Sequence, residues 1–232
     1  NKALSFSKDF LPAQLFSAQL ELQAKRPKAA LTIAQEIQQQ RPTEAVGYRL
    51  QGDVLMAQSK YSLAVDPYQQ AYDKRPQAPL AIAIYQARRK ANIKKPYISL
   101  EVWLEEHSDD QLVRSILAGS YQENGMLDKA VEQYKQVVKS QPKDVAALNN
   151  LAWSSHTLGR VDAVDYAKRA YDLAPDNPAV VDTFGWLLVE TGKVNRGLVL
   201  LQQAVVKAPQ LADIRSHLVV GLHTAGRKAE SN

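Results

Sequence analysis

The chain has 232 residues, 45% of them hydrophobic, and a formal net charge of +5 from 29 basic and 24 acidic side chains. This small excess of positive charge does not form a one-sided basic stripe, which argues against nucleic-acid binding. No apolar run is long enough to cross a bilayer. The chain has no cysteine, which excludes a disulfide framework and thiolate chemistry.

Prolines recur at a nearly constant spacing along the sequence. The five that mark this spacing are Pro42, Pro76, Pro142, Pro175 and Pro209. Their separations are 34, 66, 33 and 34 residues, and Ser108 stands near the middle of the double step. A fixed period of about 34 residues indicates one supersecondary unit used repeatedly, which favours an extended binding surface over a reaction centre.

The segment from Gln111 to Pro142 shows what fills one period. Apolar side chains recur three and four residues apart on both sides of Asn124-Gly125, which predicts two amphipathic helices joined by a turn. Gly125 supplies the left-handed backbone that ends the first helix. Pro142 stops the second helix because proline has no N–H. The unit is therefore expected to be helix, tight turn, helix and proline.

The same pattern divides the whole chain into units. In order they are residues 1–10 (partial), 11–44, 45–76, 77–110, 111–143, 144–177, 178–211 and 212–232 (partial). Residues 3–8 are expected to be the tail of a second helix, and residues 212–225 a first helix that ends at Gly226. Alanine or glycine recurs where two helix axes must approach within about 8–10 Å, as at Ala64 and Gly197. We interpret the chain as a single solenoid fragment of a longer array.

Three features depart from the regular pattern. In one unit Asn92 is the expected turn residue, Pro96 is expected in the first turn of the second helix, and the pattern fixes residues 80–90 only to within one position. Pro67 falls inside a predicted helix, where a kink or a late helix start is expected. Gly159 lies one residue closer to the following alanine than the other turn glycines do, which predicts a tighter turn.

The pattern resembles the tetratricopeptide repeat (TPR) position by position. With Gln111 counted as position 1, the residues at positions 7, 8, 11, 20, 24 and 32 are Leu117, Ala118, Tyr121, Ala130, Tyr134 and Pro142. The resemblance implies an all-α fold. It would be a right-handed TPR superhelix, an α-α solenoid of stacked antiparallel helix hairpins.

Signs of catalysis are missing from the sequence. The four histidines, His107, His156, His217 and His223, include no pair spaced i, i+4, and no HExxH, GxGxxG, GxxxxGK[ST] or GxSxG motif occurs. We therefore predict that the chain is not an enzyme and has no catalytic, cofactor-binding or metal-binding residues.

The TPR resemblance implies a partner-binding surface. In that family the first helix of each repeat lines a concave wall, with positions 2, 5, 9, 12 and 13 facing a partner. The candidate partner-binding residues are Arg49, Asp53, Tyr85, Arg88, Asn149, Trp153, His156, Asp182, Trp186 and Glu190. The last unit would continue this wall with Ser216, Val220 and His223.

Two tryptophans stand out among these candidates. Trp153 and Trp186 occupy the same position in neighbouring repeats, so they could anchor a partner side by side or wedge between helices as core filler. Tyr85 and Arg88 could present a ring and a cation to an acidic partner. The lysine and asparagine clamp with which some TPR proteins hold a terminal carboxylate is absent, since Asp53 stands at position 9.

The C-terminal third has a narrower resemblance. The segments that carry it are Leu148–Trp153, Tyr166–Pro178, Val181–Trp186, Gly197–Leu201 and Ile214–Leu218. They look like the closing repeats of TPR lipoproteins that accompany the exosortase/PEP-CTERM protein-sorting system. This resemblance implies a Gram-negative cell-envelope protein that faces the periplasm, is linked to exopolysaccharide machinery and is lipid-anchored through a region outside this sequence.

Two functions are consistent with these features. The first is a protein-interaction scaffold that binds a protein or peptide partner on its concave face. The alternative is a periplasmic module that guides a polysaccharide during export. A continuous apolar groove would favour peptide, whereas open tryptophans beside carboxylates such as Asp182 and Glu190 would favour sugar. Neither function involves a nucleic acid, a cofactor or a transmembrane segment in this chain.

Overall fold

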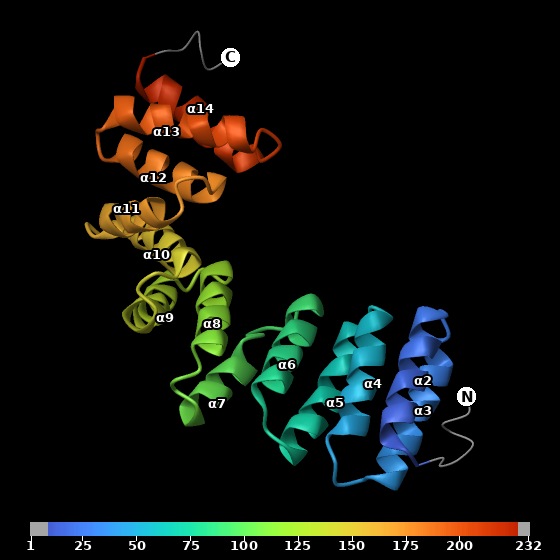
Figure 1. The fold of residues 1–232 in the computed structure, drawn as a ribbon. Helices are drawn as coiled ribbons and strands as arrows, with labels where there is room; N and C mark the ends of the chain where they lie inside the picture. Colours follow the sequence, from blue (N-terminus) through green and yellow to red (C-terminus); the bar gives the residue numbers. More distant parts are fainter. Residues whose placement is uncertain (1–8, 227–232) are drawn as a thin grey trace. The chain divides into compact units, whose positions relative to one another are not determined.

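Thirteen α-helices joined by short turns, without a strand, make up residues 9–226, the part of the chain that the computed structural model describes (Figure 1). The expected helix tail at residues 3–8 lies outside the described residues. The chain forms two compact units, residues 1–113 and 114–232, which we call the N-terminal and C-terminal units. The architecture is an all-α helical-repeat solenoid, as the sequence predicted.

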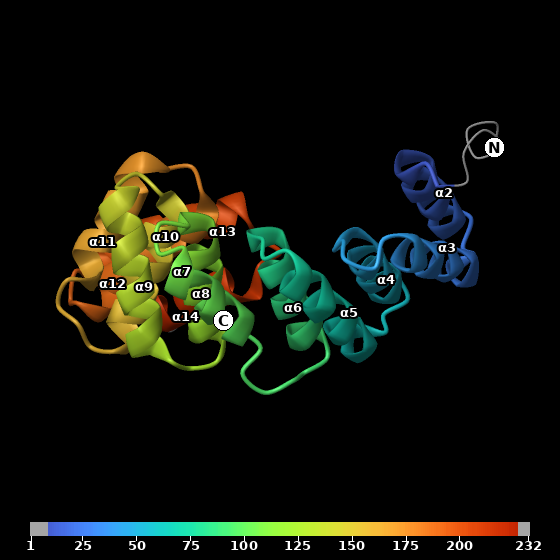
Figure 2. The ribbon, with the colours of Figure 1, turned by 90° about the horizontal axis from the view of Figure 1, so that it is seen from below.

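Within each unit the helices pack in sequence order (Figures 1 and 2). The N-terminal unit contains α2 (Leu11–Gln23), α3 (Pro27–Gln40), α4 (Val46–Ala57), α5 (Tyr61–Lys74), α6 (Ala78–Lys90) and α7 (Ile98–Glu106). The helices that follow are α8 (Gln111–Glu123), α9 (Leu127–Ser140), α10 (Val145–Thr157), α11 (Ala163–Leu173), α12 (Pro178–Glu190), α13 (Val194–Lys207) and α14 (Ala212–Thr224). Each successive pair from α9 to α14 is in contact, and the first helices α10, α12 and α14 also touch in order.

Each described hairpin has a residue with a positive φ just after its first helix, and the α6–α7 connection has a second one at Lys95. The residues that follow the first helices are Lys25, Ser59, Asn92, Gly125, Gly159 and Gly192. At the last of them the Gly192 N–H donates to the Val189 carbonyl at 3.0 Å, and the Lys193 N–H donates to the Leu188 carbonyl at 2.8 Å. This paired bonding satisfies the last free carbonyls of the first helix. Asn92, with a φ of 55°, is confirmed as the turn residue of its unit.

Of the two outcomes expected at Pro67, the late helix start is wrong, and the expected place of Pro96 in the first turn of its helix is also wrong. Helix α5 begins at Tyr61 and continues through Pro67 without a late start. The carbonyl that loses its partner there belongs to Leu63, whose side chain is 60% exposed, so water can replace the lost hydrogen bond. Pro96 lies two residues before α7, which begins at Ile98, rather than in its first turn.

The repeat that contains Gly159 does not have the tighter turn that the sequence predicted; its second helix is shorter instead. Its turn has the same pattern as the others, with the Gly159 N–H bonded to the His156 carbonyl and the Arg160 N–H bonded to the Ser155 carbonyl. The shortening appears instead in α11, which has 11 residues where α9 and α13 have 14. This repeat is one residue shorter than its neighbours between the turn glycine and the closing proline, and its second helix begins later, at Ala163.

Small residues let the paired helices approach. The buried ones include Ala18, Ala30, Ala64, Ala118, Ala130 and Ala204, all fully enclosed. The approach of α12 and α13 is close enough to require glycine. A Cβ built on Gly197 would lie 2.6 Å from the Gly185 carbonyl oxygen and 2.9 Å from the Val189 nitrogen. Backbone atoms cannot swing aside, so the alanine usual at this position does not fit.

This contact predicts the effect of Gly197→Ala. Overpacking against backbone should lower the free energy of unfolding by about 1–3 kcal/mol, although alanine favours a helix over glycine by about 1 kcal/mol. Gly119→Ala is the matched control, because its Cβ would meet only the Tyr134 hydroxyl at 3.6 Å, and it should be neutral or stabilising. Urea unfolding followed by circular dichroism measures both variants, and equal effects would contradict the close approach.

Candidate functional site

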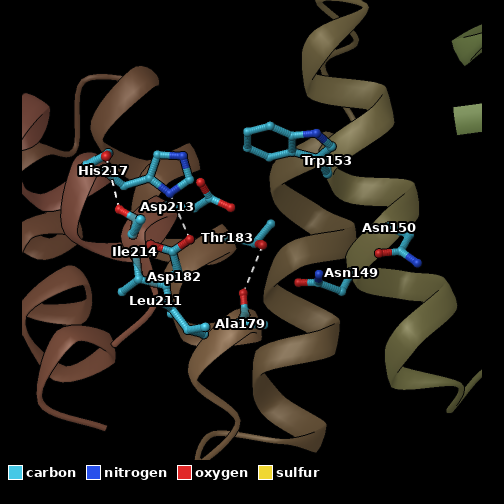
Figure 3. A pocket seen from close by; sticks show the side chains of 12 residues that line it. Asn149, Asn150, Trp153, Ala179, Asp182, Thr183, Leu211, Asp213, Ile214 and His217 are labelled. Atoms are coloured by element: carbon cyan, nitrogen blue, oxygen red, sulfur yellow. Dashed lines mark hydrogen bonds and ion pairs between the residues drawn. The ribbon is translucent and has the colours of Figure 1, made fainter. Parts of the chain in front are cut away.

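Three first helices of the C-terminal unit, α10, α12 and α14, line an open pocket of about 550 Å³, which we call the wall pocket (Figure 3). Its lining residues are Asn149, Asn150, Trp153, Ala179, Asp182, Thr183, Leu211, Ala212, Asp213, Ile214, Ser216 and His217. The pocket thus brings together three of the ten candidates, Asn149, Trp153 and Asp182, with Ser216, which was expected to continue the wall.

Repeat geometry explains which side chains meet there. Asn149, Asp182 and Ser216 occupy position 5 of three successive first helices, one helix turn from Trp153 at position 9. The next residues along, at position 6, also line the pocket; they are Asn150, Thr183 and His217. Equivalent positions of stacked repeats lie side by side, so two adjacent columns of side chains form one wall.

Asp182 and His217 form a buried polar pair that joins α12 to α14. Asp182 is only 6% exposed, and its Oδ2 accepts a hydrogen bond from His217 Nδ1 at 2.7 Å. The other carboxylate oxygen of Asp182, Oδ1, receives no hydrogen bond from any residue that the structure describes, and the same holds for Oδ1 of Asn149. Two shielded acceptors therefore lie in the pocket wall without a donor.

Both tryptophans contact the same histidine. The His217 ring stacks on Trp186 with 4.7 Å between ring centroids, and it lies 5.8 Å from the Trp153 ring at a tilt of 41°. Trp186 also packs against the core of the unit. Both indoles remain partly exposed, so each of them packs against the fold and keeps some open surface. The packing is what the filler interpretation predicts, and the open surface that remains leaves the anchor interpretation a prediction.

The remaining C-terminal candidates lie outside the wall pocket. His156 is partly exposed in the last turn of α10, and Glu190 is exposed at the end of α12. Neither side chain lines the pocket.

In the N-terminal unit, Asp53 of α4 is held by two neighbours. It accepts a hydrogen bond from the Tyr68 hydroxyl at 2.7 Å, and Arg49 Nε lies 3.8 Å from its other oxygen. Desolvation raises the pKa of the Asp53 carboxyl, opposed by the Tyr68 hydrogen bond and the charge of Arg49. Burial and the bond to Asp53 likewise raise the pKa of Tyr68. Because 46% of the Asp53 side chain is exposed, solvent screens its shift and keeps the effect on stability small.

Arg49 and Arg88 line separate pockets of the N-terminal unit. Arg49 borders one of about 340 Å³ together with Lys74 and Arg75, and Arg88 borders a smaller one. Tyr85 is only 7% exposed, so its ring belongs to the core and not to a ring-and-cation surface. The sequence pattern fixed the repeat position of each residue in α6 only to within one residue. A shift of one residue rotates a helix enough to move a ring from the surface to the core.

Within residues 9–226, no cluster of three or more histidine, cysteine, aspartate or glutamate side chains could hold a metal ion. None of the described helices has the length and apolar character needed to cross a membrane. The chemistry of the wall pocket therefore comes from indole, amide, carboxylate, hydroxyl and imidazole groups.

Sequence reasoning missed three important members of the pocket, Asp213, His217 and Thr183. Asp213 stands at position 2 of the last unit, which is a wall position, so the repeat register could have identified it. His217 and Thr183 stand at position 6, which the wall pattern of the family omits. Only the packing of α14 against α12 reveals that this column also faces the pocket.

The fold and the wall pocket define an all-α helical-repeat protein with a pocket lined by one row of its helices. Residues 117–178 match the family model for the tetratricopeptide repeat. A TPR repeat-containing protein of Pseudomonas aeruginosa is 24% identical over 176 residues, which are 72% of this chain and 29% of that protein. The chain thus spans less than a third of that relative's length.

Solved structures show the same fold. YrrB, described as a TPR protein with an unusual peptide-binding site, superposes with a TM-score of 0.59 at 21% identity, covering 78% of this chain and 94% of that one. The C-terminal part of a TPR repeat-containing protein of Cytophaga hutchinsonii superposes with a TM-score of 0.69 at 10% identity, covering 93% and 90%. The chain therefore shares the helical-repeat fold of these TPR proteins, and residues 117–178 match the family model for the repeat.

The buried pair predicts a local effect of His217→Ala. Removing the imidazole leaves the Asp182 carboxylate buried without its hydrogen-bond donor, which should cost about 1–3 kcal/mol and loosen α14 from α12. Amide hydrogen exchange should accelerate in residues 212–224 while α2–α6 remain unchanged. His223→Ala, on the exposed side of the same helix, should leave exchange as it is. Equal exchange in the two variants would show that the pair does not hold α14.

Proposed function

We propose that this protein is a non-enzymatic interaction scaffold whose wall pocket binds a peptide segment of a partner protein. The observation that carries this proposal is the combination of the partly exposed Trp153 with two shielded acceptors, Asn149 Oδ1 and Asp182 Oδ1, that receive no hydrogen bond from residues 9–226. A peptide offers both N–H donors and apolar side chains, so it can satisfy the acceptors and cover the indole together.

The dimensions of the pocket agree with this ligand class. A volume of about 550 Å³ lies within the range of about 300–1,000 Å³ typical of ligand sites. Trp153 would supply the large buried area that dominates binding energy at interfaces. The shared fold with YrrB, a TPR protein that has a peptide-binding site, supports the same class of partner.

A polysaccharide remains the second candidate because Trp153 lies beside the carboxylates of Asp182 and Asp213 in the pocket. Of the two carboxylates that sugar binding would favour, however, Glu190 lies outside the pocket and Asp182 is already bonded to His217. The pocket therefore favours a peptide over a sugar chain.

We further infer a location for the parent protein from the closing repeats alone. Their resemblance to PEP-CTERM-associated lipoproteins supports a periplasm-facing role in a Gram-negative envelope, beside exopolysaccharide and sorting machinery. Fractionation of source cells, with detection of the native protein by antibody, tests this inference. Recovery in the cytosolic fraction would overturn it.

Selection from a library of displayed random peptides tests the binding proposal. Peptides enriched on the purified protein should lose at least about tenfold in affinity on Trp153→Ala. Val206→Ala, a truncation on α13 at a side chain that is 81% exposed, should bind as the wild type does. Calorimetry with oligosaccharides provides the competing arm. A saccharide signal without any peptide binder would reverse the order of the two candidates.

A further inference from the structure

We propose that the wall pocket selects its ligand by a cationic group, a lysine or arginine side chain or an N-terminal ammonium, held between Trp153 and the carboxylates of Asp182 and Asp213. This inference deepens the proposed function and rests on it, because it names the part of a peptide that the pocket would recognise. Both kinds of cation share the same chemistry, a positive charge that carries N–H donors.

The charge of the pocket opposes the charge of the chain. The lining contains two carboxylates, Asp182 and Asp213, and neither lysine nor arginine, whereas the chain as a whole carries +5. His217 is the other titratable group of the lining, and it is already bonded to Asp182. A concave site lined by one sign of charge attracts ligands of the opposite sign.

Asp182 provides a buried acceptor that the fold leaves unsatisfied. The residue is 6% exposed, and its Oδ1 is shielded from solvent without a donor from residues 9–226. A carboxylate can accept several hydrogen bonds, and leaving one of its oxygens shielded and unpaired is costly. An ammonium or guanidinium group that enters the pocket can supply the missing donor and, at the same time, the opposite charge.

Asp213 adds a second carboxylate near the rim of the pocket. It lies in the first turn of α14 and is exposed. No ion pair or hydrogen bond to its side chain is found among the described residues of the chain. Its charge is therefore available to a ligand, while its exposure means that substitution should leave the fold intact.

Trp153 supplies the opposite wall. Figure 3 shows its indole on one side of the pocket, with Asp182, Asp213 and His217 on the other. The faces of tryptophan rings attract cations within about 6 Å of the centroid, more strongly when water is excluded. An alkylammonium placed between the indole and the carboxylates would thus cover its carbon stem with the ring and direct its N–H groups toward oxygen.

The N-terminal unit contains a natural contrast. Its pocket of about 340 Å³ is lined by Arg49, Lys74 and Arg75, with Glu44 as the carboxylate of its lining. That pocket should repel the ligand that the wall pocket attracts. The two units of one protein therefore allow general attraction to the chain to be separated from recognition by the site.

Small probes test the selectivity directly. Nα-acetyl-lysine amide and its uncharged analogue Nα-acetyl-norleucine amide would be titrated into the full chain. The indole N–H signal of Trp153 would report binding by NMR and would be assigned with Trp153→Phe. Lysine amide should shift this signal saturably, and norleucine amide should bind at least about tenfold more weakly. Signals of residues around Arg49 should stay in place.

Variants identify the carboxylates. Asp213→Asn should weaken lysine amide by about twofold to fivefold and leave norleucine amide unchanged. Asp182→Asn should do the same, since an amide oxygen still accepts from His217. Glu190→Gln, on the same helix but outside the lining, is the matched control and should bind as the wild type does. Equal binding of the two amides, or full binding by Asp213→Asn, would overturn the cationic preference.

The outcomes separate the two proposals. If selected peptides bind through Trp153 but lysine amide gives no shift, the cationic preference is wrong and the peptide-binding function stands. If lysine amide binds and no peptide can be selected, the cation site stands and the scaffold role falls. Failure of both probes would overturn both proposals.

Discussion

The fold depends on how closely paired helices can approach. At Gly185 and Gly197 the backbones of α12 and α13 come so near that a Cβ would meet a carbonyl oxygen, and elsewhere fully enclosed alanines such as Ala64 and Ala130 occupy the contact. This constraint specifies a few small residues on the faces between helices. It leaves the wall-facing positions free to carry whatever chemistry a partner requires, which is why one fold can hold an acidic pocket in one unit and a basic one in the other.

Much of the fold could be predicted from sequence because its signals are local. The spacing of apolar residues predicts the helices, and the prolines predict the breaks between hairpins. Asn92 and Gly125 predict left-handed turns. Lys25 and Ser59 also have a positive φ, although lysine and serine do not favour left-handed backbone and so do not indicate a turn. In their hairpins the packing of the two helices and the paired backbone hydrogen bonds override the local preference. Local sequence patterns do not reveal where packing determines the backbone conformation in this way.

The candidate site was less predictable because it depends on contacts between repeats. The repeat register placed Asn149, Trp153 and Asp182 on the wall, where the pocket contains them. It did not reveal that Tyr85 turns into the core, or that α5 continues through Pro67 at a place where the exposed Leu63 leaves its carbonyl open to water. His217 escaped notice because its role requires three helices from three repeats. Only their stacking brings its ring against Trp153, Trp186 and Asp182.

His217 also explains why the pocket has a defined shape. A wall made of separate repeats could slide, since each hairpin packs mainly on its neighbours. The imidazole ties α14 to α12 through Asp182 and reaches α10 through the Trp153 ring. Fixing one oxygen of Asp182 in this way orients the whole carboxylate and leaves the second oxygen without a donor from the described part of the chain. The same bond that stabilises the stacking of the last repeats thus prepares the acceptor that a ligand can use.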